Sequence, residues 1–213
     1  MAGGEKMKRI YTSILMAIIL LASCNNSPID KANALIKDDM LKKLVIAESY
    51  EPVETQVDSA FAPFDAPEFY IQTLELLKMG AEMQEYKERA KHAKSSMTIW
   101  SNPYSAYSKN QYQESKTEYE EYIEKQKTLQ AHIENAINEL KGMIRQKPRF
   151  IGFKAIHRYR AKNNAGQTLL GDELYILNKD LTEIIASYDM ASEEYGAFQE
   201  AANQIMEGTE QRP

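Results

Sequence analysis

The most regular hydrophobic pattern lies in the middle of the chain, between Ser105 and Gln146. Apolar and weakly polar residues recur there at alternating spacings of three and four, over more than four heptads and without a slip. The positions of this seam are Tyr112, Ser115, Tyr119, Tyr122, Gln126, Leu129, Ile133, Ala136, Leu140 and Met143. Such a repeat is typical of a helix that packs as in a coiled coil. It predicts one helix of about 60 Å, which Pro148 ends.

A second long helix is predicted from about Pro67 to about Ala93, because proline is favoured at the first helical position. Its expected inner face consists of Tyr70, Leu74, Leu77, Ala81 and Tyr86. Residues 95–107, between the two helices, contain the only tryptophan of the chain and an Asn-Pro turn signal. We therefore expect an antiparallel helical hairpin over about 67–146, with residues 95–107 at its tip. The seam either packs only within this chain or also binds another chain.

After Pro148 the hydrophobic period changes to two, which indicates a half-buried β-strand. One face of this strand carries Ile151, Phe153, Ala155, His157, Tyr159 and Ala161. A turn at 163–166 is followed by a second alternating segment from Leu169 to Leu177. Together they predict a β-hairpin over about 149–187.

Residues 181–188 fit either a helix or a third strand of this hairpin. We favour the strand, because Asp189 and the acidic residues after it indicate the start of a new helix. The last helix is then expected from about Met190 to Met206.

The segment before the helical hairpin predicts a helix and then a strand. Apolar residues recur at helical spacing from Asp30, the expected N-cap, to Ala47. The alternation from Ser49 to Phe61 indicates a strand, and Pro52 restricts it to a sheet edge or a strand start. The predicted fold is α+β: one domain over 30–207, with a small antiparallel sheet, terminal helices and the inserted helical hairpin.

An apolar run near the N-terminus indicates export. Lys8 and Arg9 precede about 12 mostly apolar residues from Ile10 to Leu21. This length suits the apolar region of a signal peptide and is short of the roughly 20 residues that a membrane-spanning helix needs. Met7 is the expected natural start.

The run ends in Leu21-Ala22-Ser23-Cys24, which resembles the lipobox of bacterial lipoproteins. The resemblance implies that residues 1–23 are a signal peptide, that cleavage falls before Cys24, and that Cys24 is acylated. Residues 24–29 would then be a lipidated tether, and several acyl chains hold a protein stably on a membrane. The alternative is an ordinary secretory signal with a chance cysteine. Because Asn25 rather than Asp follows Cys24, the resemblance implies the outer membrane, facing the periplasm.

Two further segments, SYEPVETQVDSAF and FIGFKAIHRYRAKNNAG with LYILNKDLTEI after it, resemble stretches of small uncharacterised lipoproteins of Gram-negative gut bacteria. This resemblance implies a lipoprotein with a β-hairpin. It implies no activity and no catalytic residue.

Composition narrows the candidate chemistry. The chain has 213 residues, one cysteine and a net charge of −5, so we expect no disulfide and no nonspecific binding of nucleic acid. Its three histidines are His92, His132 and His157, and the first two are expected several turns apart on the hairpin. No metal, phosphate-binding or nucleophile motif is present, and we expect no cofactor.

Three groups of residues remain as candidates. Lys154, Arg158, Arg160 and Lys162 are in phase on one strand face, which indicates either an anion-binding surface or ion pairs, with Glu54 or Glu173 as expected partners. His157, on the apolar face, is expected to be a hydrogen-bonded core residue. Trp100, Tyr104 and Tyr107 at the hairpin tip either bind a sugar or an envelope protein, or cap the core of the hairpin itself.

These observations favour a membrane-anchored, non-enzymatic lipoprotein that acts as a binding or scaffolding module in the cell envelope. The alternative is a small periplasmic hydrolase or carbohydrate-active accessory protein whose site has no recognisable motif.

Overall fold

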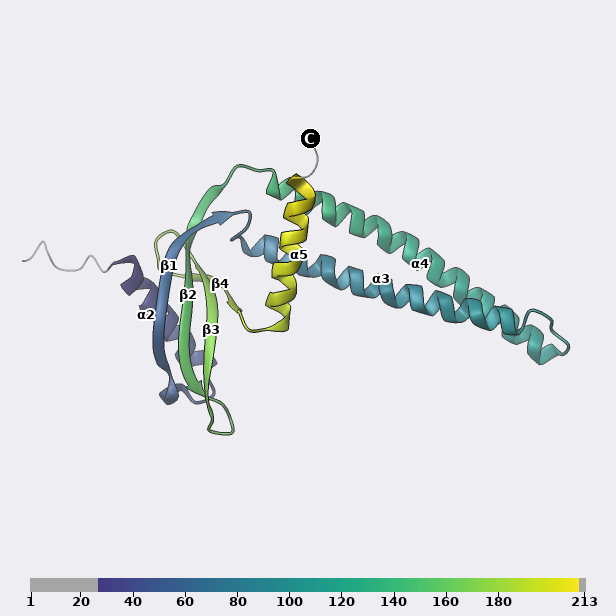
Figure 1. Cartoon of the computed structure of the whole chain (residues 1–213), viewed down its shortest axis with the longest axis horizontal. Coiled ribbons are helices and arrows are strands. Elements are labelled where there is room, and N and C mark those ends of the chain that lie inside the picture. Colours follow the sequence, from purple (N-terminus) through teal and green to yellow (C-terminus); the bar gives the residue numbers. More distant parts are fainter. Residues whose placement is uncertain (1–26, 211–213) are drawn as a thin grey trace, which may run out of the picture.

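The computed structural model describes residues 27–210 and has the predicted α+β architecture (Figure 1). In chain order its elements are α2 (Pro28–Lys43), the short 3-10 helix η1 (Ala47–Ser49), β1 (Glu51–Ala62), α3 (Pro67–Ile99), α4 (Ala106–Ile144), β2 (Arg149–Lys162), β3 (Thr168–Leu177), β4 (Ile184–Asp189) and α5 (Glu193–Glu210). The strands form a small sheet, and the hairpin of α3 and α4 is inserted between β1 and β2. The predicted fold class is confirmed.

The strands form one antiparallel sheet in the order β1-β2-β3-β4. β1 and β2 pair directly although the whole helical hairpin separates them in the chain. β1 is an edge strand, where the missing N–H of Pro52 is tolerated, as predicted. β4 confirms the preference for a strand over a helix at residues 181–188.

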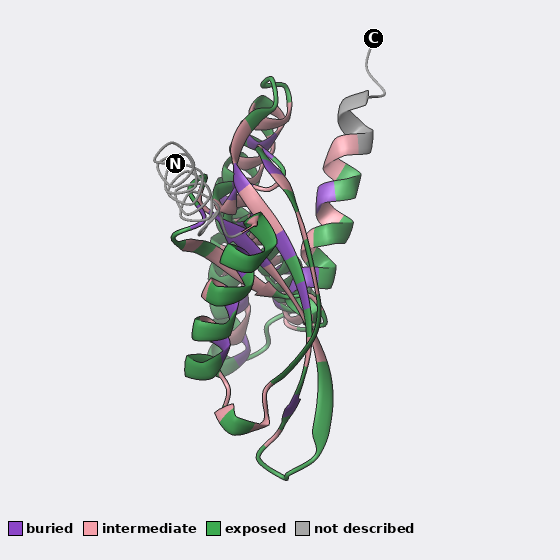
Figure 2. Ribbon diagram, turned by 90° about the vertical axis from the view of Figure 1, so that its left-hand side faces the viewer, coloured by how far each residue is buried: buried purple, intermediate pink, exposed green. Residues whose placement is uncertain are grey.

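α2 covers one face of the sheet (Figure 1). Its residues Ile36 and Met40 are fully buried and pack in one cluster with Ala155, Tyr175 and Leu177 of the strands. In Figure 2 the buried side of α2 faces the strands and its outer side is exposed. Burying one large aliphatic side chain stabilises a fold by about 1.5–3 kcal/mol, so α2 is an integral part of the core.

The ends of α2 differ from the prediction. Ser27, not Asp30, is the N-cap: Oγ of Ser27 accepts the N–H of Asp30 at 3.2 Å, and Oδ2 of Asp30 accepts the N–H of Ser27 at 3.0 Å. These two hydrogen bonds form a capping box, and the bonds from Ser27 lower the pKa of Asp30. The helix also ends at Lys43 rather than Ala47, because residues 47–49 form a separate 3-10 turn.

The predicted seam of α4 is confirmed. All ten seam positions are buried or half-buried, and most of the residues between them are exposed. The seam packs against α3, for example where Nε2 of Gln126 donates to the backbone oxygen of Tyr86 at 3.2 Å. Packing within the chain therefore accounts for the heptad pattern.

The predicted inner face of α3 is partly wrong. Leu77 and Ala81 are exposed, whereas the buried side of the helix consists of Phe69, Tyr70, Thr73, Met83, Ala90 and Ala93. Apolar residues occur on several sides of α3, so its own pattern does not define one face. α3 also continues to Ile99, beyond the predicted end at Ala93, and the connection to α4 is therefore shorter than the predicted tip.

α5 packs across the base of the hairpin, on the side of the sheet away from α2 (Figure 1). Phe69 of α3, Leu140 of α4 and Ala202 of α5 share one buried cluster. The ring of Tyr70 lies 4.1 Å from that of Tyr188 on β4, which joins the hairpin base to the sheet. α5 starts at Glu193, three residues after the predicted start, because Oγ of Ser192 accepts the N–H of Tyr195 at 3.1 Å and caps the first turn.

Candidate functional site

The helical hairpin is the feature that sets this molecule apart from a compact sheet domain. α3 has 33 residues and α4 has 39, which correspond to about 50 Å and about 58 Å of helix. Figure 1 shows that the distal part of the hairpin projects well beyond the sheet and α5. Side chains at its end are therefore presented to the surroundings of the protein rather than to its core.

The end of the hairpin is formed by the last turn of α3, a short connection, and the first turn of α4. Ser105 caps α4 through a reciprocal hydrogen-bonded pair with Ser108, at 3.1 Å and 2.9 Å. Trp100 is half-buried, and its ring lies edge-on to that of Tyr107 at 5.9 Å and 90°. Tyr104 is 89 % exposed, and no hydrogen bond or ring contact within the described residues engages its side chain.

The three predicted tip residues thus lie together but play different parts. Trp100 and Tyr107 pack on each other, in keeping with the alternative that they cap the hairpin. Tyr107 is nevertheless 65 % exposed, as is Ile99 at 73 %. Ile99 was not among the predicted tip residues and becomes part of the exposed end because α3 is longer than predicted.

The predicted anion-binding surface on β2 is largely neutralised within the chain. Lys154 Nζ lies 3.0 Å and 3.2 Å from the two carboxylate oxygens of Asp65. Arg158 forms a bidentate pair with Asp172, at 2.7 Å and 3.2 Å. Arg160 lies 3.7 Å from a carboxylate oxygen of Glu51.

The partners in these pairs are therefore not the predicted Glu54 and Glu173. Lys162 contributes its backbone N–H to Oγ of Ser49 at 2.7 Å, and its side chain forms no ion pair within the described part of the chain. Because carboxylates already occupy most of the positions that an anion would take, this geometry favours the ion-pair alternative.

His157 is a buried hydrogen-bonded residue, as predicted. Its Nε2 lies 2.8 Å from Oη of Tyr50, and its Nδ1 lies 2.9 Å from Oγ1 of Thr55. The ring stacks on that of Tyr159. Burial lowers the pKa of His157, and both ring nitrogens have partners, so neither is free to act on a ligand.

A second polar cluster joins α2 to the sheet. Nζ of Lys43 lies 2.6 Å from Oδ2 of Asp39 and 3.6 Å from a carboxylate oxygen of Glu173, and it donates to Oγ of Ser187 at 2.6 Å. The hydroxyl of the buried Tyr175 lies within hydrogen-bond distance of both carboxylates. The sequence analysis missed this cluster, because its members come from three elements and share no spacing signal.

The lysine–serine contact in this cluster does not form a catalytic pair. A lysine that activates a serine must take up its proton and therefore has to be neutral. Nζ of Lys43 is instead held in ion pairs with the carboxylates of Asp39 and Glu173. Burial and the hydrogen bonding of its hydroxyl to Glu173 raise the pKa of Tyr175 far above its ordinary value, so its hydroxyl stays protonated. The cluster holds α2 on the sheet.

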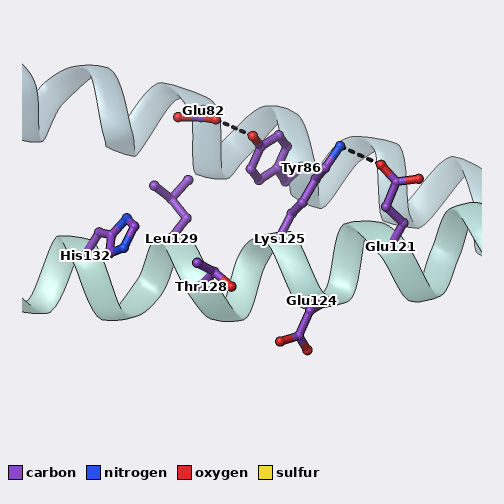
Figure 3. Close-up of a pocket in the computed structure, with 8 residues that line it drawn as sticks. All are labelled: Glu82, Tyr86, Glu121, Glu124, Lys125, Thr128, Leu129 and His132. Carbon is purple, nitrogen blue, oxygen red and sulfur yellow. Dashed lines mark hydrogen bonds and ion pairs between the residues drawn. The ribbon is translucent and has the colours of Figure 1, made fainter.

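A groove of about 440 Å³ lies on the flank of the hairpin. Figure 3 shows the side chains that line it, with His132 and Leu129 near one end. Four of its polar side chains form two pairs: Tyr86 donates to Glu82, and Lys125 lies 2.6 Å from Glu121. They do not converge on a common point. Within residues 27–210, no group of three or more His, Asp or Glu side chains could hold a metal ion.

Cys24 and the rest of the predicted signal peptide and lipobox lie outside the described residues, so lipidation stays a prediction. No helix in the described part of the chain is long and apolar enough to cross a membrane. Comparison with models of known protein families, with curated proteins and with solved structures gives no match. Function therefore has to be argued from the geometry and the sequence of this chain alone.

Proposed function

We propose that this protein is a membrane-anchored, non-enzymatic lipoprotein of the cell envelope that binds a partner through the end of its helical hairpin. The observation that carries the proposal is the exposed end of the hairpin, where Ile99, Tyr104 and Tyr107 project from a scaffold about 50 Å long. Aromatic residues on a rigid support are typical anchors of binding surfaces.

The lipobox-like sequence predicts a lipid anchor at Cys24, just before the start of α2. Cys24 precedes Ser27, the N-cap of α2, by three residues. Figure 1 shows that the start of α2 and the end of the hairpin lie at opposite ends of the molecule. A protein held through Cys24, on the periplasmic face of the outer membrane, would thus keep the sheet near the membrane and point the hairpin away from it.

The hydrolase alternative needs polar side chains that converge on a substrate. Most of the candidate polar groups in the described residues are instead paired with one another, in the flank groove, on β2 and around Lys43. This pairing supports a binding role.

The proposal is tested by affinity capture from envelope extract, including its membrane fraction, with the full chain and a tip variant. Trp100→Ala, Tyr104→Ala and Tyr107→Ala together remove the aromatic end, and we expect the partner recovered by the wild type to be lost. The matched control replaces Val45, Leu169 and Leu170, exposed apolar residues away from the hairpin, with alanine. Equal recovery by the tip variant and the wild type would place binding elsewhere, and Arg158 and Arg160 would be changed next.

A further inference from the structure

We propose that the end of the hairpin binds an anionic lipid surface. The hairpin tip is defined here by the side chains of Ile99, Trp100, Tyr104 and Tyr107, together with the cations Arg89, Lys91, Lys94 and Lys109 that flank them on the two helices. The inference rests on the proposed function, because it names the partner class of the same hairpin. The ligand chemistry is that of anionic phospholipid headgroups over hydrocarbon.

The first property that fits a lipid surface is the exposed apolar end. Ile99 and Tyr104 are 73 % and 89 % exposed; Ile99 is the last residue of α3, and Tyr104 lies in the short connection to α4. Tryptophan and tyrosine combine an apolar ring with one polar group, and they are enriched where hydrocarbon meets headgroups. The edge-on contact between Trp100 and Tyr107 gives this end a fixed aromatic base.

The second property is flanking charge of one sign. Residues 89–113 contain four cationic side chains and no Asp or Glu, although the whole chain has a net charge of −5. Lys94 and Lys109 form no ion pair within residues 27–210. Arg89 and Lys91 pair only with exposed carboxylates of their own helix, at 3.7 Å each. Lys94 and Lys109 thus give the end of the hairpin an unpaired positive charge on an acidic protein, whereas Arg89 and Lys91 are partly balanced by Glu85 and Glu88.

The spacing along α3 places these cations within reach of headgroups. Lys94 precedes Ile99 by five residues, or about 7 Å, and Arg89 precedes it by ten residues, or about 15 Å. Attraction to a charged surface acts over about 8 Å at physiological salt, and long cationic side chains extend toward headgroups. Lys94 and Lys109 should therefore contribute most when the aromatic end enters the interface.

The residue types favour a bilayer over a protein groove. Three of the four flanking cations are lysines, and lysine is depleted in protein–protein interfaces. Lysine combined with exposed aromatic and aliphatic residues is typical of segments that lie on an anionic bilayer. A soft bilayer also accepts a convex end without the need for a complementary pocket.

The position of the predicted anchor adds one consequence. Because the start of α2 lies at the opposite end of the molecule from the hairpin tip, a chain held through Cys24 would not present the tip to the membrane that holds it. The anionic surface is therefore a second one, and the protein would bridge two lipid surfaces.

Trp100 provides a direct test, because it is the only tryptophan of the chain. The full chain is mixed with vesicles rich in phosphatidylglycerol, and tryptophan emission is followed with and without brominated lipid. We expect a shift to shorter wavelengths and quenching, both suppressed by salt near 1 M, where screening acts within about 3 Å. Vesicles of phosphatidylcholine should give neither effect. The readout reports on the tip even where the apolar N-terminal run also binds the vesicles.

Two matched pairs of variants test the two properties separately. Lys94→Gln with Lys109→Gln should raise the lipid concentration for half-maximal shift about 25-fold, since each cation near the surface contributes roughly fivefold. Lys78→Gln with Lys127→Gln removes the same charge on the same hairpin, about 30 Å from its end. This control should leave the titration unchanged.

Ile99→Ser with Tyr104→Ser should weaken binding about tenfold or more, because both side chains would leave water for the interface. Val45→Ser with Leu170→Ser is the matched apolar control, since both residues are exposed and lie away from the hairpin. All four substituted positions are exposed, so the variants are expected to fold.

Three results would overturn the proposal: no shift with anionic vesicles, an equal shift with phosphatidylcholine, or an unchanged titration for the Lys94 and Lys109 variant. Capture of a protein or glycan that depends on the tip, without any lipid effect, would refute the lipid surface and leave the proposed binding function standing. If the tip variant changed neither the capture of a partner nor the binding to vesicles, the lipid surface and the proposed binding function would both be refuted.

Discussion

Lowering the pH below neutrality is expected to destabilise the folded protein through His157. Its side chain is 1 % exposed, and hydrogen bonds to Tyr50 and Thr55 occupy both ring nitrogens. A neutral imidazole donates from one nitrogen and accepts at the other, which suits two hydroxyl partners. A protonated ring would place a charge in the core. Burial accordingly lowers the pKa of His157 from its ordinary value of 6.5.

The sign and size of the effect follow from linkage. The unfolded chain binds a proton on this residue with a pKa of about 6.5, and the folded chain binds it less readily. The stability associated with neutral His157 is therefore fully present above pH 6.5 and is lost as the pH falls toward the folded-state pKa. The expected loss in the free energy of unfolding between about pH 7.5 and about pH 5.5 is up to about 1.4 kcal/mol.

Urea unfolding at these two pH values, for the wild type and His157→Gln, isolates this contribution. At both pH values the variant should have a free energy of unfolding about 1–3 kcal/mol lower than the wild type, because buried hydrogen bonds are disturbed. Its free energy of unfolding should also fall less than that of the wild type when the pH is lowered. His132→Gln is the matched control, because His132 is exposed on the hairpin, and it should keep the pH dependence of the wild type. If His157→Gln also kept that dependence, another group would be responsible.

Three further predictions concern the anchor, the hairpin and the first helix. Cys24→Ser should abolish fatty-acid labelling and release the protein from the membrane fraction, and equal labelling of variant and wild type would contradict the lipobox. Replacing residues 85–122 by a short glycine-containing turn should leave a core that unfolds cooperatively in a thermal scan, because the distal hairpin contacts mainly itself; a chain that cannot fold would show that the hairpin belongs to the core. Ser27→Ala should lower the free energy of unfolding by about 0.5–2 kcal/mol in urea, and an unchanged value would mean that the capping box contributes nothing.

The elements that could be predicted from the sequence are those whose signal is local and periodic. The seam of α4 repeats without a slip, so its face follows from the spacing alone. The alternation over 153–162 in β2 is equally regular, and the buried positions Ala155, His157 and Ala161 fall in phase. Pro52 restricted β1 to a sheet edge or a strand start because proline lacks a donor.

The features that could not be predicted depend on contacts between distant segments. α3 has apolar residues on several sides, so only packing against α4 and α5 selects Phe69 and Met83 over Leu77. The partner of Arg158 follows from the register of β2 and β3, which places Asp172 directly opposite. The spacing of carboxylates along the sequence does not define which residues of β2 and β3 lie opposite each other.

The positions of the cations at the hairpin tip could be predicted from the sequence only in part. Trp100 and Tyr104 are close in the chain, so the sequence alone indicates an aromatic cluster. Lys94 and Lys109 are separated by the turn and lie on different helices, and only the antiparallel return of the chain places both beside that cluster. The sequence shows that residues 89–113 contain no Asp or Glu. This stretch spans the end of one helix and the start of the next. The antiparallel return that brings its charges together follows from the sequence, whereas the longer α3, with Ile99 exposed at its end, is known only from the structure. The lipid-binding hypothesis needs both.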